Sequence, residues 1–455
     1  MGEPSRRLHS SSTYRGWHRP LAVAATLVVA ALGAAVPAAS AGSTAQEVSR
    51  GVTIPAFYNP PAQLPAANGA LVRTEPLPLA LSLPGIAGPL PGRATRLMYK
   101  STDSNGRPVA VTGAYIDPTA SWKGNGPRPL VALAPGTMGQ GDQCAASLAL
   151  QKPLTLTPQT ASVGYEDLAI YRLLAAGVAV VVTDYAGLGT TDRVHTYVNR
   201  LDAGHALLDA ARAALRLPST SLTPGSRIGL YGYSQGGGAS ASAAELQSSY
   251  APKLHLVGTY AGAPPADLLQ VIKGIDGSAL AGALGWAING FAQSDATLKK
   301  VVDNHINTAG RAALADLSTM CVGDAIFRYG FSSSPKWTTD GESVSQIVAT
   351  EPELKSFLSQ QRIGTLTPAT PVRIATGIQD DIVPHAQARQ LAADWCTKGA
   401  DITYAPIRLP NLGDKLLTNH FLPLLTDQSA AISWLTQRLK DMPATSTCTA
   451  LPSQP

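Results

Sequence analysis

One short segment of the chain places a serine where it could act as a nucleophile. Residues 232–236 have the sequence Gly-Tyr-Ser-Gln-Gly, which has the spacing G-x-S-x-G. Residues 227–231 predict a short buried strand before it, and the small residues 237–246 predict a helix after it. A sharp turn between the two would lift the hydroxyl of Ser234 clear of the backbone, and the flanking glycines would leave room for it. Since a serine needs a base to take its proton, this segment predicts nucleophilic catalysis with a base elsewhere.

Four histidines follow Ser234 and could supply that base. His255 lies close to the serine in sequence, just before a predicted strand, and His305 falls in a helical stretch. His385 begins a predicted helix. His420 lies in a loop after the last predicted strand, which is where the chain order serine, acid, histidine requires the base. We therefore predict that His420 is the base.

The acid of such a triad is expected at the end of a strand. Asp380 and Asp381 directly follow a strand predicted over residues 372–376. An aspartate there can hold the imidazole in one tautomer and stabilise the imidazolium. Asp381 is better placed to cap the helix predicted from residue 384, so we predict that Asp380 is the acid.

The reaction also needs backbone N–H groups that hold the negative oxygen of the reacting carbonyl. Gln235, the residue after the serine, is expected to supply one of them. The other should come from the glycine loop 135–139, in which Thr137 is the best candidate. Asp142, further along, is a candidate for orienting that backbone.

Strands and helices alternate around these residues. Two strands flank Asn105-Gly106 and predict an antiparallel hairpin. The strands that follow are short, apolar and separated by helices, which predicts an α/β protein with a mainly parallel sheet. The predicted hairpin strands are 95–100 and 109–116; the later strands are 130–134, 178–183, 227–231, 256–260, 372–376 and 402–407, and the helices are 165–176, 202–216, 384–399 and 427–440.

The alternation of strands and helices is absent from two parts of the chain. Residues 42–92 are rich in Pro, Ala and Gly and predict an extended lead-in segment. Residues 264–366 are mostly helical, and we expect them to form a cap or lid inserted over the carboxyl edge of the sheet, where such folds bind ligands. The core is then expected over residues 93–263 and 367–455.

The N-terminal residues predict export. Residues 1–41 contain four arginines, then the apolar run 21–32, then the small-residue triplet Ala39-Ser40-Ala41, as in a cleaved signal peptide. We find no convincing later run of membrane-spanning length, so we expect no stable membrane insertion after cleavage. We expect the mature protein to be extracellular.

Composition narrows the class of protein. The chain has 455 residues, of which 45% are hydrophobic and 14% charged, as in a globular α/β protein. A formal net charge of +5 is small for this length, and there is no basic stripe with aromatic residues, so we expect no nucleic-acid partner. The four cysteines suggest two disulfides, for which the sequence permits three pairings. They include no C-x-x-C pair, so we expect no zinc site.

Several segments together resemble the secretory lipase family of fungi and actinobacteria over roughly residues 50–440. The resemblance implies an α/β-hydrolase with a helical cap that acts on carboxylic esters of lipids. It implies the same triad, Ser234, Asp380 and His420, and the disulfides Cys144–Cys321 and Cys396–Cys448. The matching segments, in order, are 135–137, 141–147, 184–189, 232–236, 380–384, 395–400 and His420.

These observations predict a secreted serine hydrolase that cleaves carboxylic esters of lipids through an acyl-enzyme. We expect no metal or organic cofactor, a lipid or small ester as substrate, and a monomer. The alternatives are a short-chain carboxylesterase, a peptidase or acyltransferase on the same fold, and a catalytically dead exported binding protein.

Overall fold

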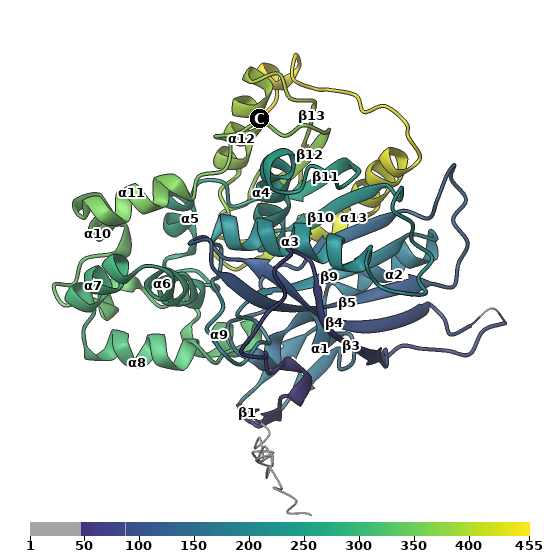
Figure 1. The fold of residues 1–455 in the computed structure, drawn as a ribbon. Helices are drawn as coiled ribbons and strands as arrows, with labels where there is room; N and C mark the ends of the chain where they lie inside the picture. Colours follow the sequence, from purple (N-terminus) through teal and green to yellow (C-terminus); the bar gives the residue numbers. More distant parts are fainter. Residues whose placement is uncertain (1–46, 87) are drawn as a thin grey trace, which may run out of the picture. The chain divides into compact units, whose positions relative to one another are not determined.

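A nine-stranded sheet forms the centre of the computed structural model, which describes residues 47–86 and 88–455 (Figure 1). The expected signal peptide, residues 1–41, lies outside the described residues. The strand order is β13-β12-β11-β10-β6-β9-β5-β4-β3. Six strands from β13 to β9 run parallel: β6 (Leu130–Ala134), β9 (Ala179–Ala186), β10 (Ile228–Tyr233), β11 (Leu256–Gly262), β12 (Val372–Gly377) and β13 (Ile402–Ile407).

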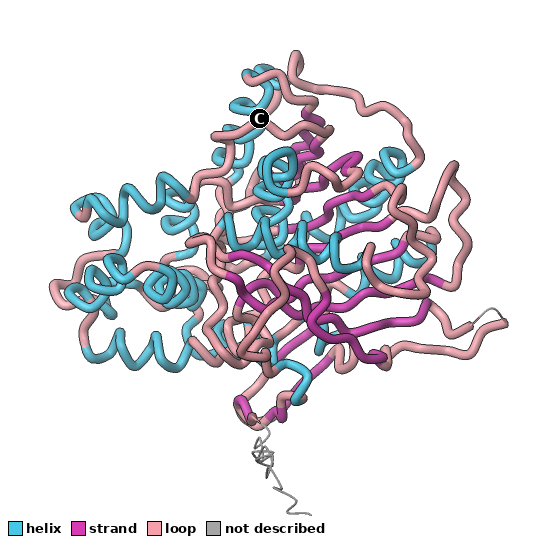
Figure 2. The backbone as a smooth tube through the Cα atoms, viewed as in Figure 1, coloured by secondary structure: helices cyan, strands magenta, loops and turns pink. Residues whose placement is uncertain are grey.

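Helices cover both faces of the sheet, which is why these strands are apolar on both sides (Figure 2). Along β6, Leu130 and Ala132 belong to the core beneath α3 and α4, whereas Val131 and Leu133 belong to the core beneath α2 and α13. The helices on the first face are α3 (Arg200–Ala214), α4 (Gln235–Tyr250) and α12 (His385–Thr397); those on the second are α1 (Ala146–Ala149), α2 (Asp167–Ala175) and α13 (Thr418–Leu439). The predicted α/β fold is confirmed.

The antiparallel edge begins earlier in the chain than predicted. β4 (Gly92–Thr102) and β5 (Pro108–Pro118) form the predicted hairpin, and β5 pairs with β9. β3 (Leu71–Leu77) lies within the expected lead-in segment but pairs with β4 as the edge strand. Pro76 lies within β3, and an edge strand tolerates proline because one side of it needs no hydrogen bonds. The Pro-rich composition hid this strand.

Seven helices lie between β11 and β12, where the sequence predicts a helical insertion. In Figure 1 they gather to the left of the sheet. Residues of α5, α6, α8 and α9 form a core around the fully buried Trp286, and a second core around Phe291 joins α5 and α6 to α7, α10 and α11. They are α5 (Leu268–Ile275), α6 (Gly282–Ser294), α7 (Ala296–His305), α8 (Thr308–Leu317), α9 (Val322–Tyr329), α10 (Val344–Thr350) and α11 (Pro352–Gln360).

The last helix begins before its predicted start. The sequence predicts a helix over 427–440 with His420 in a loop, but α13 begins at Thr418, so His420 lies in its first turn. Two features explain why the sequence does not predict the start of α13 at Thr418. Leu417, at the N-cap, has a φ of 73° and no capping side chain, and Pro423 lies inside the helix, where proline is usually a helix breaker.

In the part of the chain that the structure describes, two small hairpins lie outside the main sheet. β1 (Val48–Ser49) pairs with β2 (Val52–Thr53), and β7 (Leu154–Leu156) pairs with β8 (Ala161–Val163). Among the residues that the structure describes, no helix is both long enough and apolar enough to cross a membrane.

Candidate active site

Ser234 occupies a strained turn between β10 and α4. It has a φ of 57° and a ψ of −122°, a backbone conformation that residues other than glycine rarely adopt. The elements meet closely: a Cβ on Gly232 would lie 2.2 Å from the carbonyl oxygen of Gly236, and one on Gly236 would lie 2.0 Å from that of Ala134. Only glycine fits at these two positions, which explains the spacing of the motif.

The three residues predicted as a triad lie together. The Ser234 Oγ is 2.8 Å from the His420 Nε2, and the His420 Nδ1 is 2.7 Å from the Asp380 Oδ2. His420 and Asp380 are buried, whereas Ser234 is half-buried. An ionised Asp380 accepts the Nδ1–H of His420, which leaves Nε2 free to accept the serine proton. The arrangement can therefore activate Ser234 as a nucleophile.

Backbone groups hold Asp380 in place. Its Oδ1 accepts the N–H groups of Ile382 at 3.2 Å and of Val383 at 2.9 Å. The expectation that Asp381 caps the next helix is wrong, because its carboxylate accepts the N–H of Lys415 instead. α12 starts only after Pro384, whose side chain cannot cap it.

The other histidines serve other contacts. The His305 Nε2 lies 2.8 Å from the Glu351 Oε1 within the helical insertion. The His385 Nε2 lies 3.0 Å from the Tyr404 Oη. His255 precedes β11, and its carbonyl accepts the N–H of Ile228.

The loop after β6 carries Thr137 and lies beside Ser234. Thr137, Ser234 and His420 line one cavity. The Tyr165 hydroxyl donates to the Thr137 carbonyl at 3.0 Å, and the Thr137 Oγ1 lies 2.7 Å from the Tyr197 Oη. Side chains from two other segments thus fix the backbone that is expected to hold the oxyanion.

Glu166 also contacts this loop, and the sequence does not predict that role. Its Oε1 accepts the N–H of Gly136 at 2.7 Å, whereas the sequence suggested Asp142 for orienting the loop. Burial raises the pKa of Glu166 to about 7. Its position just before α2 resembles an ordinary acidic residue at a helix start, so no local signal distinguishes it.

Gln235 is the first residue of α4, where backbone N–H groups have no partner within the helix. Its side-chain Nε2 lies 2.9 Å from the Nε2 of His195, a buried histidine whose Nδ1 lies 3.0 Å from the Ala186 carbonyl oxygen. Burial lowers the pKa of His195 to about 4, so its ring stays neutral near pH 7. A neutral ring can donate from Nδ1 to Ala186 and accept from Gln235 at Nε2.

Ser234 stands between two apolar cavities. The first, here called the insertion cavity, runs toward the helical insertion and includes Tyr197, Leu268 and Phe291. A further apolar cavity inside the insertion shares Phe291 and Leu358 with it. The second, here called the Phe421 cavity, is lined by Gly136, Thr137, Tyr165, Tyr233, Leu280, Val322, Ile326, Leu417, His420, Phe421 and Leu424 as well as Ser234.

Two disulfides join the four cysteines, Cys144 to Cys321 and Cys396 to Cys448. The first links the loop after β6 to the start of α9. The two backbones also pair there, since the Gln140 N–H donates to Met320 at 2.9 Å and the Val322 N–H donates to Met138 at 2.8 Å.

Comparison with known proteins settles the family. The family model described as secretory lipase matches residues 150–447. The chain belongs to the secretory lipase family. This secretory lipase has the α/β-hydrolase fold, and it is a carboxylic ester hydrolase of the class that acts on lipid esters.

Individual relatives agree with the family assignment. A Mycobacterium tuberculosis protein named probable inactive lipase MT1628 is 30% identical over 86% of this chain and 82% of its own. The secreted triacylglycerol lipase LIP5 of Malassezia globosa is 28% identical over 72% of this chain and 68% of its own. The structure of Candida antarctica lipase A superposes with a TM-score of 0.72 at 20% identity and covers 87% of each chain. This secretory lipase therefore shares its fold with a lipase of known structure.

Proposed function

We propose that the protein is an exported lipase that cleaves carboxylic esters of lipids with Ser234, His420 and Asp380 as its catalytic triad. The observation that carries the proposal is the chain of contacts from the Ser234 Oγ to the His420 Nε2 at 2.8 Å and from the His420 Nδ1 to the Asp380 Oδ2 at 2.7 Å. These distances allow proton transfer without rearrangement of the three side chains.

In the proposed mechanism, the Ser234 Oγ attacks the ester carbonyl carbon while His420 takes the serine proton. The N–H groups of Gln235 and Thr137 hold the negative oxygen of the tetrahedral intermediate. His420 then protonates the leaving alcohol, and an acyl group remains on Ser234. Water attacks that acyl group with His420 again as base, which releases the carboxylic acid and restores the serine.

The cavities support a lipid ester as substrate. Nearly all side chains of the insertion cavity are apolar, and the cavity inside the helical insertion continues it with further apolar residues. A hydrocarbon acyl chain can occupy such a path without leaving polar groups unpaired. A peptide would bury unpaired amides there, so the lining favours an ester hydrolase over a peptidase. The helical insertion, residues 264–366, then acts as the cap over the acyl group.

Export is the second part of the proposal. The sequence of residues 1–41 has the pattern of a signal peptide, and relatives include proteins named as secreted lipases. The two disulfides suit an oxidising compartment. Finding the protein in culture medium, with its N-terminus near residue 42 by mass spectrometry, would support this; retention inside the producing cell would count against it.

The test of the triad is hydrolysis of p-nitrophenyl esters from acetate to palmitate by the mature protein and its Ser234→Ala variant. We expect the variant to lose activity by about 10⁴-fold or more and to keep its fold. The matched control is Ser248→Ala, which changes an exposed serine on the same helix, α4, and should keep full activity.

Each outcome of this test has a definite meaning. Activity retained by folded Ser234→Ala protein would refute the triad. Activity of the wild type confined to short chains would keep the triad and make the protein a short-chain carboxylesterase. No activity on any ester, together with no labelling by a fluorophosphonate probe, would favour a catalytically dead binding protein.

A further inference from the structure

The β7–β8 hairpin has its apolar face outward. Leu154 pairs with Val163 and Leu156 with Ala161, so these side chains lie on one face of the hairpin. Leu154, Leu156 and Val163 are 60%, 69% and 52% exposed. Ser162, which points the other way, is buried. A hairpin that faces water on one side normally shows the reverse pattern, which indicates that something apolar covers this face in function.

The outward face belongs to segments that also build the Phe421 cavity beside Ser234. Val163 precedes Tyr165 by two residues, Phe327 directly follows Ile326, and Tyr165, Ile326 and Phe421 itself line the cavity. The rings of Tyr165 and Phe421 pack edge to face, with their centroids 6.0 Å apart. The exposed apolar residues of these segments are Leu154, Leu156, Val163, Leu168, Phe327, Phe331, Leu412, Leu416, Phe421 and Leu425; this set is called the apolar rim below.

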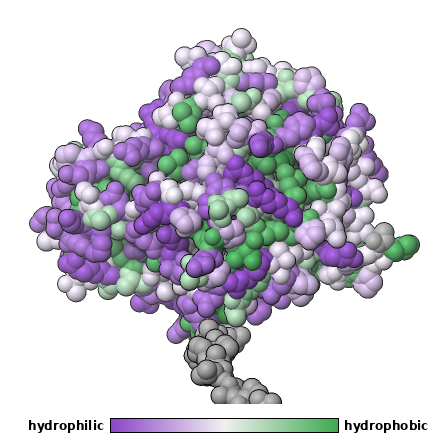
Figure 3. Space-filling model, viewed as in Figure 1, coloured by the Kyte–Doolittle hydropathy of each residue, from purple (hydrophilic) through white to green (hydrophobic). Residues whose placement is uncertain are grey.

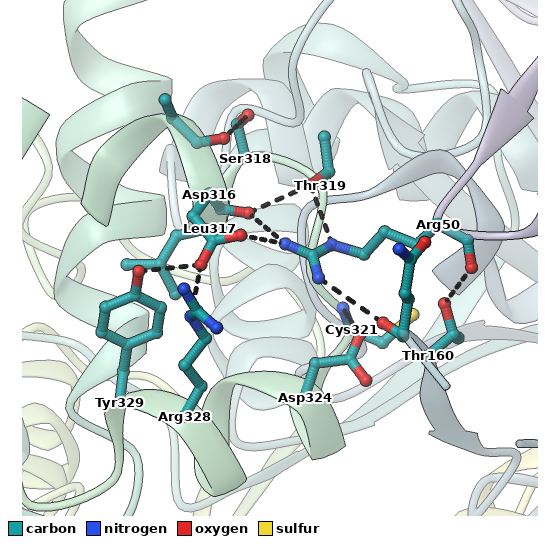
Figure 4. A network of polar contacts seen from close by, with 12 residues as sticks. Arg50, Thr160, Asp316, Leu317, Ser318, Thr319, Cys321, Asp324, Arg328 and Tyr329 are labelled. Carbon is teal, nitrogen blue, oxygen red and sulfur yellow. Dashed lines mark hydrogen bonds and ion pairs between the residues drawn. The ribbon is translucent and has the colours of Figure 1, made fainter. Parts of the chain in front are cut away.

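Polar bonds fix the hairpin against α9 and keep its apolar face turned outward. The N–H of Ala161 donates to the carboxylate of Asp324 on α9, and the hydroxyl of Thr160 donates to the carbonyl of Arg50 at 3.0 Å. The Arg50 guanidinium pairs with Asp316, which also binds Arg328 of α9 at 2.7 Å (Figure 4). The leucines cannot turn inward without breaking this network.

Two stretches of the apolar rim contain no charged residue. Residues 153–165 and 416–426 contain no Asp, Glu, Lys or Arg. Charged residues of both signs border them, namely Lys152 and Glu166 around the first stretch and Lys415 and Asp427 around the second. An uncharged apolar surface suits an aggregate whose surface presents hydrocarbon.

We propose that the apolar rim is a docking face for the surface of aggregated lipid ester, with the β7–β8 hairpin as its main contact. The proposal rests on the proposed function, because a water-insoluble ester must reach Ser234 from such a surface. Docking would bring the Phe421 cavity against the aggregate, so a lipid could pass to Ser234 without crossing water. The exposed apolar residues lie on segments that line one cavity, and exposed apolar surface beside a binding site commonly marks an interaction surface.

The test compares two matched double variants. Leu154→Thr with Leu156→Thr removes apolar surface from the hairpin while keeping strand-forming residues. Leu81→Thr with Leu83→Thr removes equally exposed leucines of the same spacing, since Leu81 and Leu83 are 60% and 68% exposed. The control leucines lie in the loop between β3 and β4, whose apolar tip projects at the right edge of Figure 3.

Binding is measured without turnover, in the Ser234→Ala background, by flotation with triolein droplets coated with phosphatidylcholine. We expect the hairpin double variant to bind the droplets about tenfold more weakly or worse, and the control double variant to bind them as the parent does. Thermal melts check that both remain folded. In the active background, the ratio of triolein to p-nitrophenyl acetate turnover should fall for the hairpin variant alone.

Other results would overturn the proposal. Equal binding by the hairpin variant and the parent would exclude the hairpin, and equal loss in both double variants would show a general effect of apolar surface. A dimer in light scattering that dissociates in the hairpin variant would show that a second copy of the chain covers this face. Failure of the proposed triad appears separately, as soluble-ester activity that survives Ser234→Ala.

Discussion

At the scale of single residues, the loop expected to hold the oxyanion depends on partners far away in sequence. Glu166 accepts the Gly136 N–H, Tyr165 donates to the Thr137 carbonyl, and the Thr137 hydroxyl bonds to Tyr197. Such outer contacts set the position of the groups that touch the substrate, and small displacements of those groups cost activity.

Replacing Glu166 tests this support. Glu166→Gln keeps an acceptor for the Gly136 N–H, so we expect kcat within about threefold of wild type. Glu166→Ala leaves a buried N–H unpaired and should lower kcat by about 10-fold to 100-fold, with a smaller change in KM. Steady-state kinetics on a soluble ester measures both. Equal kcat values for the two variants would show that the hydrogen bond does not position the loop.

Some residues of the candidate site can be predicted from the sequence, and others cannot. Ser234, Asp380 and His420 could be located from the sequence because a local motif and a fixed chain order mark them. Glu166, Tyr165 and Tyr197 could not, because each contacts the loop after β6 from another segment and none lies in a motif of its own. No motif marks His195, which contacts Gln235, so its role could not be predicted from the sequence either.

At the scale of elements, a disulfide and three backbone hydrogen bonds fasten the loop after β6 to the start of α9. The parallel strands could be predicted because their apolar runs end at clear turns. The start of α13 and the edge strand β3 could not, because Pro423 and Pro76 lie inside them, and tertiary packing outweighs the local preference against proline.

The two disulfides should differ in their effect on catalysis. Cys144→Ser with Cys321→Ser should lower the free energy of unfolding by about 2–5 kcal/mol and also reduce kcat, because the loop that carries Thr137 loses an attachment. The control is the double variant Cys396→Ser with Cys448→Ser, measured in the same experiment. It frees the end of α12 and should lower stability with little change in kcat. Denaturant unfolding and ester kinetics measure the two effects; an equal fractional loss of kcat would contradict this difference.

At the scale of the whole molecule, buried ionisable groups set how stability depends on pH. Burial raises the pKa of Glu166 to about 7 and that of Asp167 to about 6, and it lowers the pKa of His195 to about 4. Unfolding returns them to about 4.3, 3.9 and 6.5. The folded state thus holds extra protons on the carboxyls, and the unfolded state holds an extra proton on the histidine.

Proton linkage gives the direction in which each group changes the stability as the pH changes. Each of these carboxyls stabilises the folded state less as the pH rises toward its raised pKa. His195 stabilises the folded state less as the pH falls from about 6.5 toward 4. Above pH 6.5 both Glu166 and Asp142, whose pKa burial raises to about 8, still titrate, and we expect the Glu166 share of the decline in stability to be about 1 kcal/mol between pH 6.5 and 8. Glu166→Gln should remove this part of the decline, whereas Asp167→Asn should act mainly below pH 6.5. Thermal melts across pH 4–9 would measure it; a decline unchanged in Glu166→Gln would contradict the assignment.

The order of the site residues along the chain has a consequence for biosynthesis. Ser234 precedes its proposed base, His420, by 186 residues, and Cys144 precedes Cys321 by 177. A serine without a base is a poor nucleophile. A chain still being synthesised or exported, N-terminus first, therefore carries an inert Ser234 until residue 420 has emerged and folded. If the triad acts as proposed, the membrane lipids of the producing cell meet an active enzyme only after nearly the whole chain has been released.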